Sequence, residues 1–324
     1  MKSARSQTRP TLLLAILALT LYISACSSGE TGSRRGEAAA QSHASSSQSS
    51  RDSIDWSQVD RQMGRPGKEE SGGVHRYSMP RSDLRVTSQG VAIKPALALG
   101  SWLAFKPSGG NDAVAMGDLV LTEQEYNPVI ARLSQGGVAV TAVHKHLPAH
   151  SPGLWWTHVE GRGDPAKLAE TVQAALRLTG TPSAAPPSHQ SEPLAIDTAG
   201  VSEALGHQGK VNGGVYQVSI PRSETIRASG VEVSAAMGTG TALNFQPTGG
   251  GKAAINGDFV MVADEVKNVV QALESSDIQV VALHNHMLEE EPRLFFLHFW
   301  ANDDAVKLAR GLRGALDKMK LGKS

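Results

Sequence analysis

Cysteine is almost absent from this sequence, which contains only Cys26 among its 324 residues. A single cysteine forms no disulfide framework within a chain and supplies no cluster of thiolates to a metal site. If the protein binds a metal, we therefore expect the ligands to be nitrogen and oxygen atoms.

An excess of charge of one sign is also lacking, because 31 lysines and arginines balance 31 aspartates and glutamates. No strong basic field attracts nucleic acid, so we expect no nucleic-acid partner. With 19% charged and 40% hydrophobic residues the chain has a globular composition, and its length suffices for two ordinary domains.

The N-terminus has the features of a secretory signal. Three basic residues precede an apolar run, residues 11–22, that is too short for a comfortable membrane span. The run leads into residues 23–26 (ISAC), which resemble the lipobox of bacterial lipoproteins, where the cysteine is lipidated and becomes the first mature residue. We therefore predict a signal peptide over residues 1–25 and lipid on Cys26. The alternative is ordinary cleavage after a small residue, with Cys26 incidental.

These features predict an extracytoplasmic lipoprotein, periplasmic or at the cell surface, that is anchored to the membrane through lipid. Ser27 follows the cysteine, where no aspartate is present to retain the protein, so we expect the outer membrane if the source has two membranes. The sequence does not identify a protein or small-molecule partner.

The remainder of the chain is a tandem duplication. Residues 26–53 are rich in Ser, Gly, Ala and Gln and predict a flexible tether. An N-terminal repeat over residues 54–180 and a C-terminal repeat over residues 196–320 flank a proline-rich linker, residues 181–195. From residue 90 to residue 164 the two repeats align without a gap at an offset of 140, which indicates a duplicated domain.

Each repeat has the pattern helix, about four strands, helix, two strands, helix. This order predicts the α+β class, with two homologous tandem domains that are each a mostly antiparallel sheet packed with helices. Gap-free alignment predicts the same strand ladder in both repeats, since an insertion inside a strand would break its pairing. The repeats are expected to share an interface with pseudo-twofold symmetry.

Histidines mark the clearest motif of the C-terminal repeat. Residues 280–286 (VVALHNH) form a β-rich run in which His284 and His286 project to one face, because alternate strand residues share a face. His298 lies in the next run, residues 294–300, which predicts the partner strand of a hairpin. Opposite residues in a hairpin have numbers with a constant sum. His298 shares the face of His284 only if that sum is even and no bulge intervenes in either strand. We predict an even sum, such as 582.

The N-terminal repeat carries the same motif 140 residues earlier, at His144, His146 and His158. The duplicated pattern predicts a three-histidine site for a divalent metal ion such as zinc in each repeat. The alternatives are sheet histidines hydrogen-bonded to buried acids and catalytic histidines without metal.

Two pairs of acids accompany the histidines. Glu125 and Glu265 begin a predicted amphipathic helix, where an acid is favourable, although either is also a candidate fourth ligand or general base. Asp118 and Asp258 each follow a glycine inside a strand-like run. Each of these aspartates could be a metal ligand, a hydrogen-bond partner of the histidines, or a residue that caps a turn. Glu265 and Asp258 are the candidate catalytic residues, and whether the protein is an enzyme stays open.

Several runs carry a resemblance to a known family. Residues 282–287 (ALHNHM), 291–300 (EPRLFFLHFW) and 257–260 (GDFV), with Glu265 and Val266, resemble the LppY/LpqO-like family. Its members are bacterial proteins of unknown function, many of them lipoproteins, that are built from this repeat. The resemblance covers nearly all of the chain after the tether and implies the localisation and architecture, but no activity. The N-terminal repeat departs from the family pattern at Lys145 and in residues 148–153, so the resemblance implies that His284→Ala affects metal binding more than His144→Ala.

Three functions are consistent with these observations. The first is a metal-binding or sensing module of the cell envelope. The second is a metal-dependent hydrolase that acts on an envelope substrate. The third is a structural or partner-binding lipoprotein in which the histidines belong to the core.

Overall fold

The computed structural model describes residues 54–183 and 194–322, which belong to one compact unit. The predicted signal peptide (1–25), Cys26, the tether (26–53) and most of the linker (181–195) lie outside the described residues. Within the described ranges, no helix is long and apolar enough to cross a membrane.

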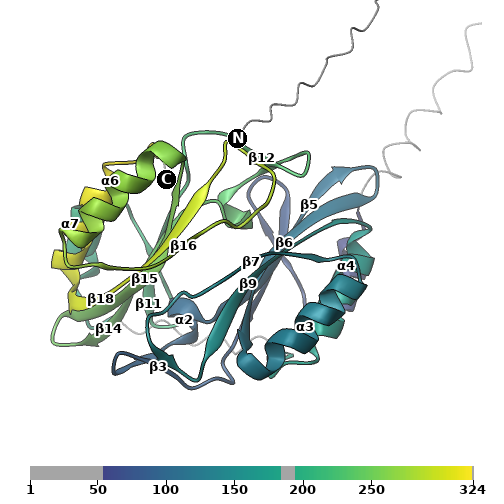
Figure 1. Ribbon diagram of the computed structural model, residues 1–324, viewed down its shortest axis with the longest axis horizontal. Helices are drawn as coiled ribbons and strands as arrows, with labels where there is room; N and C mark the ends of the chain where they lie inside the picture. Colours follow the sequence, from purple (N-terminus) through teal and green to yellow (C-terminus); the bar gives the residue numbers. More distant parts are fainter. Residues whose placement is uncertain (1–53, 184–193, 323–324) are drawn as a thin grey trace, which may run out of the picture. The chain divides into compact units, whose positions relative to one another are not determined.

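The N-terminal repeat contains four helices and nine strands (Figure 1). The helices are α1 (Trp56–Met63), α2 (Pro95–Ala98), α3 (Glu123–Gln135) and α4 (Pro165–Leu176). The strands are β1 (Lys68–Glu70), β2 (Val74–Pro80), β3 (Val86–Ser88), β4 (Val91–Ile93), β5 (Gly100–Gly109), β6 (Asp112–Thr122), β7 (Ala139–His144), β8 (His150–Ser151) and β9 (Leu154–Gly163).

The C-terminal repeat has the same order of elements, with a 3₁₀ turn in place of α2. The helices are α5 (Thr198–Leu205), η1 (Ala235–Met237), α6 (Ala263–Glu274) and α7 (Ala305–Leu316). The strands are β10 (Lys210–Asn212), β11 (Val215–Ile220), β12 (Ile226–Ala228), β13 (Val231–Val233), β14 (Thr241–Gly249), β15 (Lys252–Met261), β16 (Gln279–His284), β17 (Glu290–Glu291) and β18 (Phe295–Asp304).

The strand order is identical in the two repeats. The first large sheet has the order β1-β2-β5-β6-β9-β7, and the second has the corresponding order β10-β11-β14-β15-β18-β16. All of the pairings are antiparallel. Each repeat adds a small sheet of three short strands, β4-β3-β8 or β13-β12-β17. The predicted α+β class with two homologous domains is confirmed, whereas the small sheets are not evident from the sequence.

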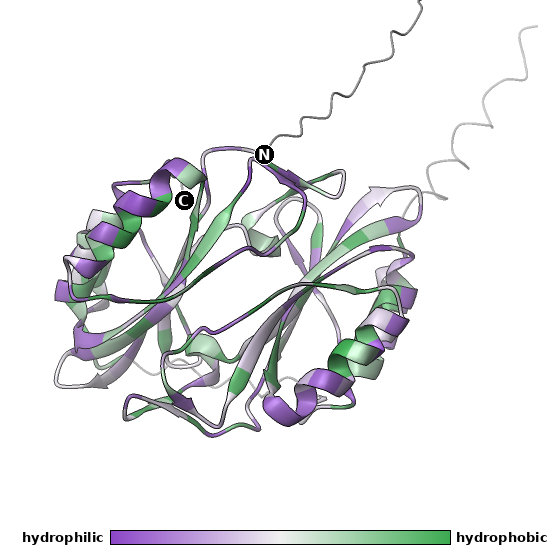
Figure 2. Ribbon diagram, viewed as in Figure 1, coloured by the Kyte–Doolittle hydropathy of each residue, from purple (hydrophilic) through white to green (hydrophobic). Residues whose placement is uncertain are grey.

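The amphipathic helices form as their sequences predict. Thr122 and Glu125 make a capping box at the start of α3, since each side chain accepts a hydrogen bond from the other residue's backbone N–H. On α3, Val129 and Leu133 are buried one turn apart, as a helix with one apolar face requires. Figure 2 shows this mixture of hydrophobic and hydrophilic residues on α3 and on its counterpart α6.

Each repeat has an outer core between its large sheet and its long helices. In the N-terminal repeat this core includes Leu119 and Val159 from the sheet and Leu168 and Val172 from α4. The C-terminal repeat has the equivalent core beneath α6 and α7. The outer cores therefore occupy only one face of each large sheet.

The other face of each sheet packs against the opposite repeat. One mixed core joins Val114 and Met116 to Phe296 and Val260, and a second joins Trp156 to Trp300. The contacts follow a pseudo-twofold relation, because α2 packs on β14 and β15 while η1 packs on β2 and β5. The central strands β6 and β15 are thus buried on both faces, which explains their long apolar runs.

Candidate metal centre

The histidine hairpins place three imidazoles of each repeat on the inward face. His284 pairs with Phe296 and Ala282 pairs with His298, so the opposite residues sum to 580. In the N-terminal repeat, His144 pairs with Trp156 and the sum is 300. Both sums are even as predicted, although the value is 580 rather than 582. A bulge beyond Ala282 changes the sum only after the histidines have been aligned.

The six rings converge where the repeats meet. Three ring pairs cross from one repeat to the other with centroid separations of 3.7–3.8 Å: His144–His284, His146–His298 and His158–His286. The last two pairs are equivalents of each other at the offset of 140, while His144 and His284 are each other's counterparts. The pseudo-twofold axis therefore passes between His144 and His284.

Three groups of histidines bring their ring nitrogens within 4.8 Å of one another, as a metal ion requires. The groups are His144–His158–His284, His144–His146–His298 and His284–His286–His298. Two of the three mix residues of both repeats. The triplet expected in the C-terminal repeat is one of these groups, the triplet expected in the N-terminal repeat is not, and the structure brings all six histidines together. We call these six residues the histidine cluster.

The histidine cluster concentrates polar atoms that are buried without a hydrogen-bond partner. Among the described residues fifteen buried side-chain polar atoms lack a partner, and ten of them lie in this cluster or on the two adjacent aspartates. Both ring nitrogens of His144 and His284 belong to this set, as does Nε2 of each of the other four histidines. The first alternative, histidines hydrogen-bonded to buried acids, does not describe these nitrogens.

Backbone carbonyls orient three of the rings. Nδ1 of His298 donates to the carbonyl of Gly257 at 2.7 Å, and Nδ1 of His286 lies 3.2 Å from the carbonyl of Gly238. The backbone of Gly117 makes the equivalent hydrogen bond to His158. A carbonyl that accepts from Nδ1 leaves the lone pair on Nε2, the arrangement usual for a metal-ligating imidazole.

The glycine at the equivalent positions 117 and 257 permits close strand packing beside the histidines. A Cβ at Gly257 would lie 1.9 Å from the carbonyl oxygen of Ala242, and one at Gly117 would lie 2.6 Å from that of Trp102. The backbones therefore approach closely at both glycines, and β6 and β15 run through them without interruption.

Asp118 and Asp258 lie at the histidine cluster. Their carboxylates approach Nε2 of His146 at 3.4 Å and Nε2 of His286 at 3.2 Å, in both cases outside hydrogen-bonding geometry. Both aspartates are buried, and each pairs across the ladder with a histidine of its own repeat. They are in position to act as ligands or as partners of the ligands, and neither caps a turn.

Burial controls the protonation of this region. Burial raises the pKa of Asp258 to about 6, with a further increase from the negative charge of Asp118. Burial, and after it the neighbouring imidazoles, lowers the pKa of His158 and of His286 to about 3. The pKa values of His144 and His284 also fall for these reasons. These four histidines are neutral near pH 7, the state that binds a metal ion.

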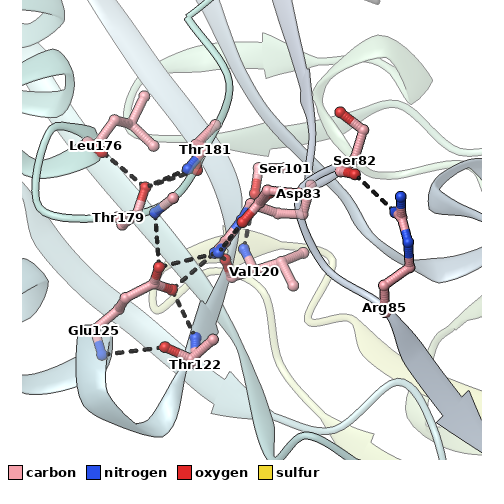
Figure 3. Close-up of polar contacts among 12 residues, drawn as sticks. Ser82, Asp83, Arg85, Ser101, Val120, Thr122, Glu125, Leu176, Thr179 and Thr181 are labelled. Carbon is pink, nitrogen blue, oxygen red and sulfur yellow. Dashed lines mark hydrogen bonds and ion pairs between the residues drawn. The ribbon is translucent and has the colours of Figure 1, made fainter.

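The glutamates at the helix starts belong to a different feature. Glu265 accepts hydrogen bonds from the guanidinium of the buried Arg222 at 2.7 and 3.1 Å and from the backbone N–H of Val262. Glu125 binds Arg81 in the same way, together with Asp83 (Figure 3). Sequence reasoning missed both arginines, although they follow equivalent prolines, Pro80 and Pro221. The carboxylate of Glu265 is thus engaged in a buried ion pair, and Asp258 is the candidate base that lies at the cluster.

Lys145, whose presence suggested a weaker first site, points away from the histidine cluster. Its ammonium donates to the carbonyl of Leu154 and lies 3.6 Å from the ring centroid of Trp155. Its counterpart Asn285 donates to the carbonyls of Thr141 and Met287. Both residues secure the loop after the histidine strand, so their difference does not distinguish the two triplets.

The accessible space beside the cluster is small. A cavity of about 10 Å³ is lined by nine residues that include His158 and His286. Pockets for organic ligands are typically about 300–1,000 Å³. This cavity therefore has room for an ion or a water molecule, and the unpartnered ring nitrogens of the histidine cluster are buried.

The family of this chain follows from a profile comparison. The profile described as "Domain of Unknown Function (DUF1259)" matches residues 57–178 and again residues 199–318. The chain belongs to this family. Each match lies within one of the two repeats, so one family domain corresponds to one repeat. A search of curated proteins found no significant match.

Solved structures give only distant matches. The trimeric bacterial microcompartment shell protein PduB is 13% identical, with 77% of this chain and 88% of that chain covered and a TM-score of 0.20. EtuB from Clostridium kluyveri is 8% identical, with 77% and 90% covered and a TM-score of 0.17. A double-ringed trimeric shell protein of the RMM microcompartment is 10% identical, with 74% and 93% covered and a TM-score of 0.19. These TM-scores are too low to bear on the fold or function of this chain.

Proposed function

We propose that this protein is a metal-binding module of the cell envelope, in which the histidine cluster holds a divalent transition-metal ion such as zinc. The ten unpartnered atoms of the cluster and its two aspartates carry the proposal. An unsatisfied buried polar group costs about 1–3 kcal/mol. Ten of them cost on the order of 10 kcal/mol, which is comparable to the whole stability of a domain. A bound metal ion satisfies several of these atoms at once.

The donor set fits such an ion. Neutral imidazole is a common ligand for zinc, copper, nickel and iron, and a buried carboxylate beside it suits a divalent charge. Asp118 and Asp258 supply up to two negative charges to offset the charge of the ion. Because Asp258 has a pKa of about 6, metal binding near neutral pH releases few protons from it.

The enclosure of the cluster favours binding over catalysis. A hydrolase keeps an open coordination position that its substrate reaches, whereas a binding site is closed by protein. The cavity beside the cluster, about 10 Å³, admits no envelope polymer or peptide. With Glu265 engaged by Arg222, Asp258 is the remaining candidate base, and its side chain is buried.

The cellular location forms part of the proposal. The lipobox-like residues 23–26 and the resemblance to the LppY/LpqO-like family both favour an extracytoplasmic protein that a lipid on Cys26 anchors to a membrane. A metal-binding domain held there by a tether senses or stores metal ions outside the cytoplasm. The lipid anchor supplies the membrane as its partner.

Elemental analysis of the purified full chain tests the metal-binding proposal. Protein that has been stripped with a chelator, reloaded with zinc and desalted is expected to retain at least about one equivalent of metal. The variant His144→Ala/His284→Ala serves as the comparison, because each of the three histidine groups contains at least one of these residues. Equal metal content in the parent and the double variant would contradict the proposal.

A further inference from the structure

The cavity beside the histidine cluster combines two kinds of metal ligand. Its lining includes His158, His286 and three methionines, Met116, Met237 and Met287. The methionines are at most 4% exposed. The volume of about 10 Å³ corresponds to roughly one water-sized sphere, which holds an ion but no organic molecule.

The methionines gather here from separate elements. Met116 lies on β6, Met237 ends η1, and Met287 follows the strand β16. Three of the eight methionines of the chain therefore line this one cavity. Two elements belong to the C-terminal repeat and one to the N-terminal repeat, so the cavity exists only where the repeats meet.

The positions equivalent to the three methionines carry no sulfur. At the offset of 140, Asn256, Leu97 and Leu147 occupy the positions of the three methionines. Methionine often fills irregular gaps in cores. Leucine serves that purpose at two of the equivalent positions, so packing alone does not account for sulfur on only one side. Asn256 instead donates to the carbonyls of His146 and Phe299.

Both histidines of the cavity are prepared to bind an ion. Nε2 of His158 and Nε2 of His286 are buried without hydrogen-bond partners. The backbones of Gly117 and Gly238 hold the two rings through hydrogen bonds. The rings stack at a centroid distance of 3.7 Å. The cavity therefore brings two imidazole and three thioether side chains around one ion-sized space.

Ligand softness identifies the ion. Thioethers are soft donors that suit Cu(I), and imidazole also suits copper. Zinc is bound mainly by thiolate, imidazole and carboxylate, so a thioether-rich site favours copper over zinc. We propose that this cavity is a Cu(I) site, with ligands from His158, His286 and the thioethers of Met116, Met237 and Met287. The inference rests on the proposed function, because both histidines belong to the histidine cluster. It adds Cu(I), a soft monovalent ion, to the metal ions that the histidine cluster binds.

The test compares two metals in the same full chain. Metal-free protein is titrated anaerobically with Cu(I) in competition with a chromophoric Cu(I) chelator, and separately with Zn(II). The triple variant Met116→Leu/Met237→Leu/Met287→Leu removes all three thioethers at nearly constant volume. Met261→Leu is the matched control, because Met261 is fully buried in the outer core of the C-terminal repeat.

The triple variant is expected to bind Cu(I) at least about 10-fold more weakly, since loss of even an outer partner of a metal ligand costs about 10–100-fold. Its Zn(II) affinity and the Cu(I) affinity of Met261→Leu are expected to match the parent. X-ray absorption of the Cu(I)-loaded parent should show sulfur neighbours. This measurement does not depend on the folding of any variant.

Two results overturn the inference. One is a Cu(I)-loaded parent without sulfur neighbours, and the other is a folded triple variant with the Cu(I) affinity of the Met261→Leu control. A parent that binds Zn(II) but no Cu(I) refutes the Cu(I) site and leaves the proposed function intact. A parent that binds neither ion refutes both.

Discussion

His144 and His284 lie on either side of the pseudo-twofold axis, and replacing either one with alanine should weaken metal binding equally. His144→Ala eliminates two of the three histidine groups and leaves His284–His286–His298, while His284→Ala eliminates two and leaves His144–His146–His298. This expectation replaces the larger effect of His284→Ala that the sequence favours, because Lys145 points away from the cluster.

The size of the effect follows from linkage. Metal ion at about 100 times its dissociation constant stabilises the folded protein by about 2.7 kcal/mol. In a protein of this size each 1 kcal/mol raises Tm by about 2–4 °C, so the parent should gain about 5–11 °C. Each single variant should lose most of this gain, and the double variant should lose all of it.

The assay is thermal unfolding of each variant with and without zinc. The difference within a variant cancels any change in the stability of its metal-free form, such as the cavity that alanine leaves at the buried His144. His75→Gln is the control, since His75 binds Asp60 in the same repeat, lies in none of the histidine groups and should leave the gain unchanged. A full gain in one single variant and none in the other would refute the shared centre.

Three further predictions concern other parts of the molecule. The metal-free protein should lose stability as the pH falls, because the pKa values of His158 and His286 are about 3 in the folded state against an ordinary 6.5, so below pH 6.5 the unfolded chain binds more protons. Each histidine then costs about 2 kcal/mol at pH 5, and denaturant unfolding at pH 5 and pH 7 that gives equal free energies would contradict this. Glu265→Gln should reduce the free energy of unfolding by about 3 kcal/mol, because it leaves a buried charge on Arg222 less compensated, while the metal content stays constant. Loss of metal from this variant would indicate that Glu265 is a ligand of the metal ion after all. Cys26→Ser should release the protein from the membrane fraction and lower its mass by that of the lipid, and retention with unchanged mass would argue against lipidation.

The alternation of side chains along a strand predicted the histidine face but not the register. An even sum was required for His298 to join His284, and an even sum is present. The value is 580 rather than 582 because the hairpin loop after His284 sets the partner of each histidine, whereas the bulge near Val281 lies beyond the histidines and changes the sum only there. Periodicity fixes which face a side chain occupies, whereas loop length and bulges fix its exact partner.

Local sequence patterns could not predict that the two histidine triplets lie together. His144 and His284 are 140 residues apart, and neither propensity nor periodicity specifies which sheet faces pack together. The available signal was the long apolar run of β15, where residues on both faces are buried. Such a run indicates a strand covered on each side, and the helices alone cover only one. The role of Glu265 was equally ambiguous, because the buried Arg222 that engages it lies 43 residues away in the sequence.

The position of the pseudo-twofold axis at the histidine cluster has an evolutionary consequence. A protein with one repeat would have to dimerise to bury the same face, and its metal centre would consist of two identical halves. Joining the repeats in one chain keeps the halves at high effective concentration and frees each copy to mutate alone. Met116 opposite Asn256 and Thr141 opposite Val281 are substitutions of this kind. Gene duplication thereby allowed one end of an ancestral symmetric centre to acquire a ligand chemistry that the other end does not share.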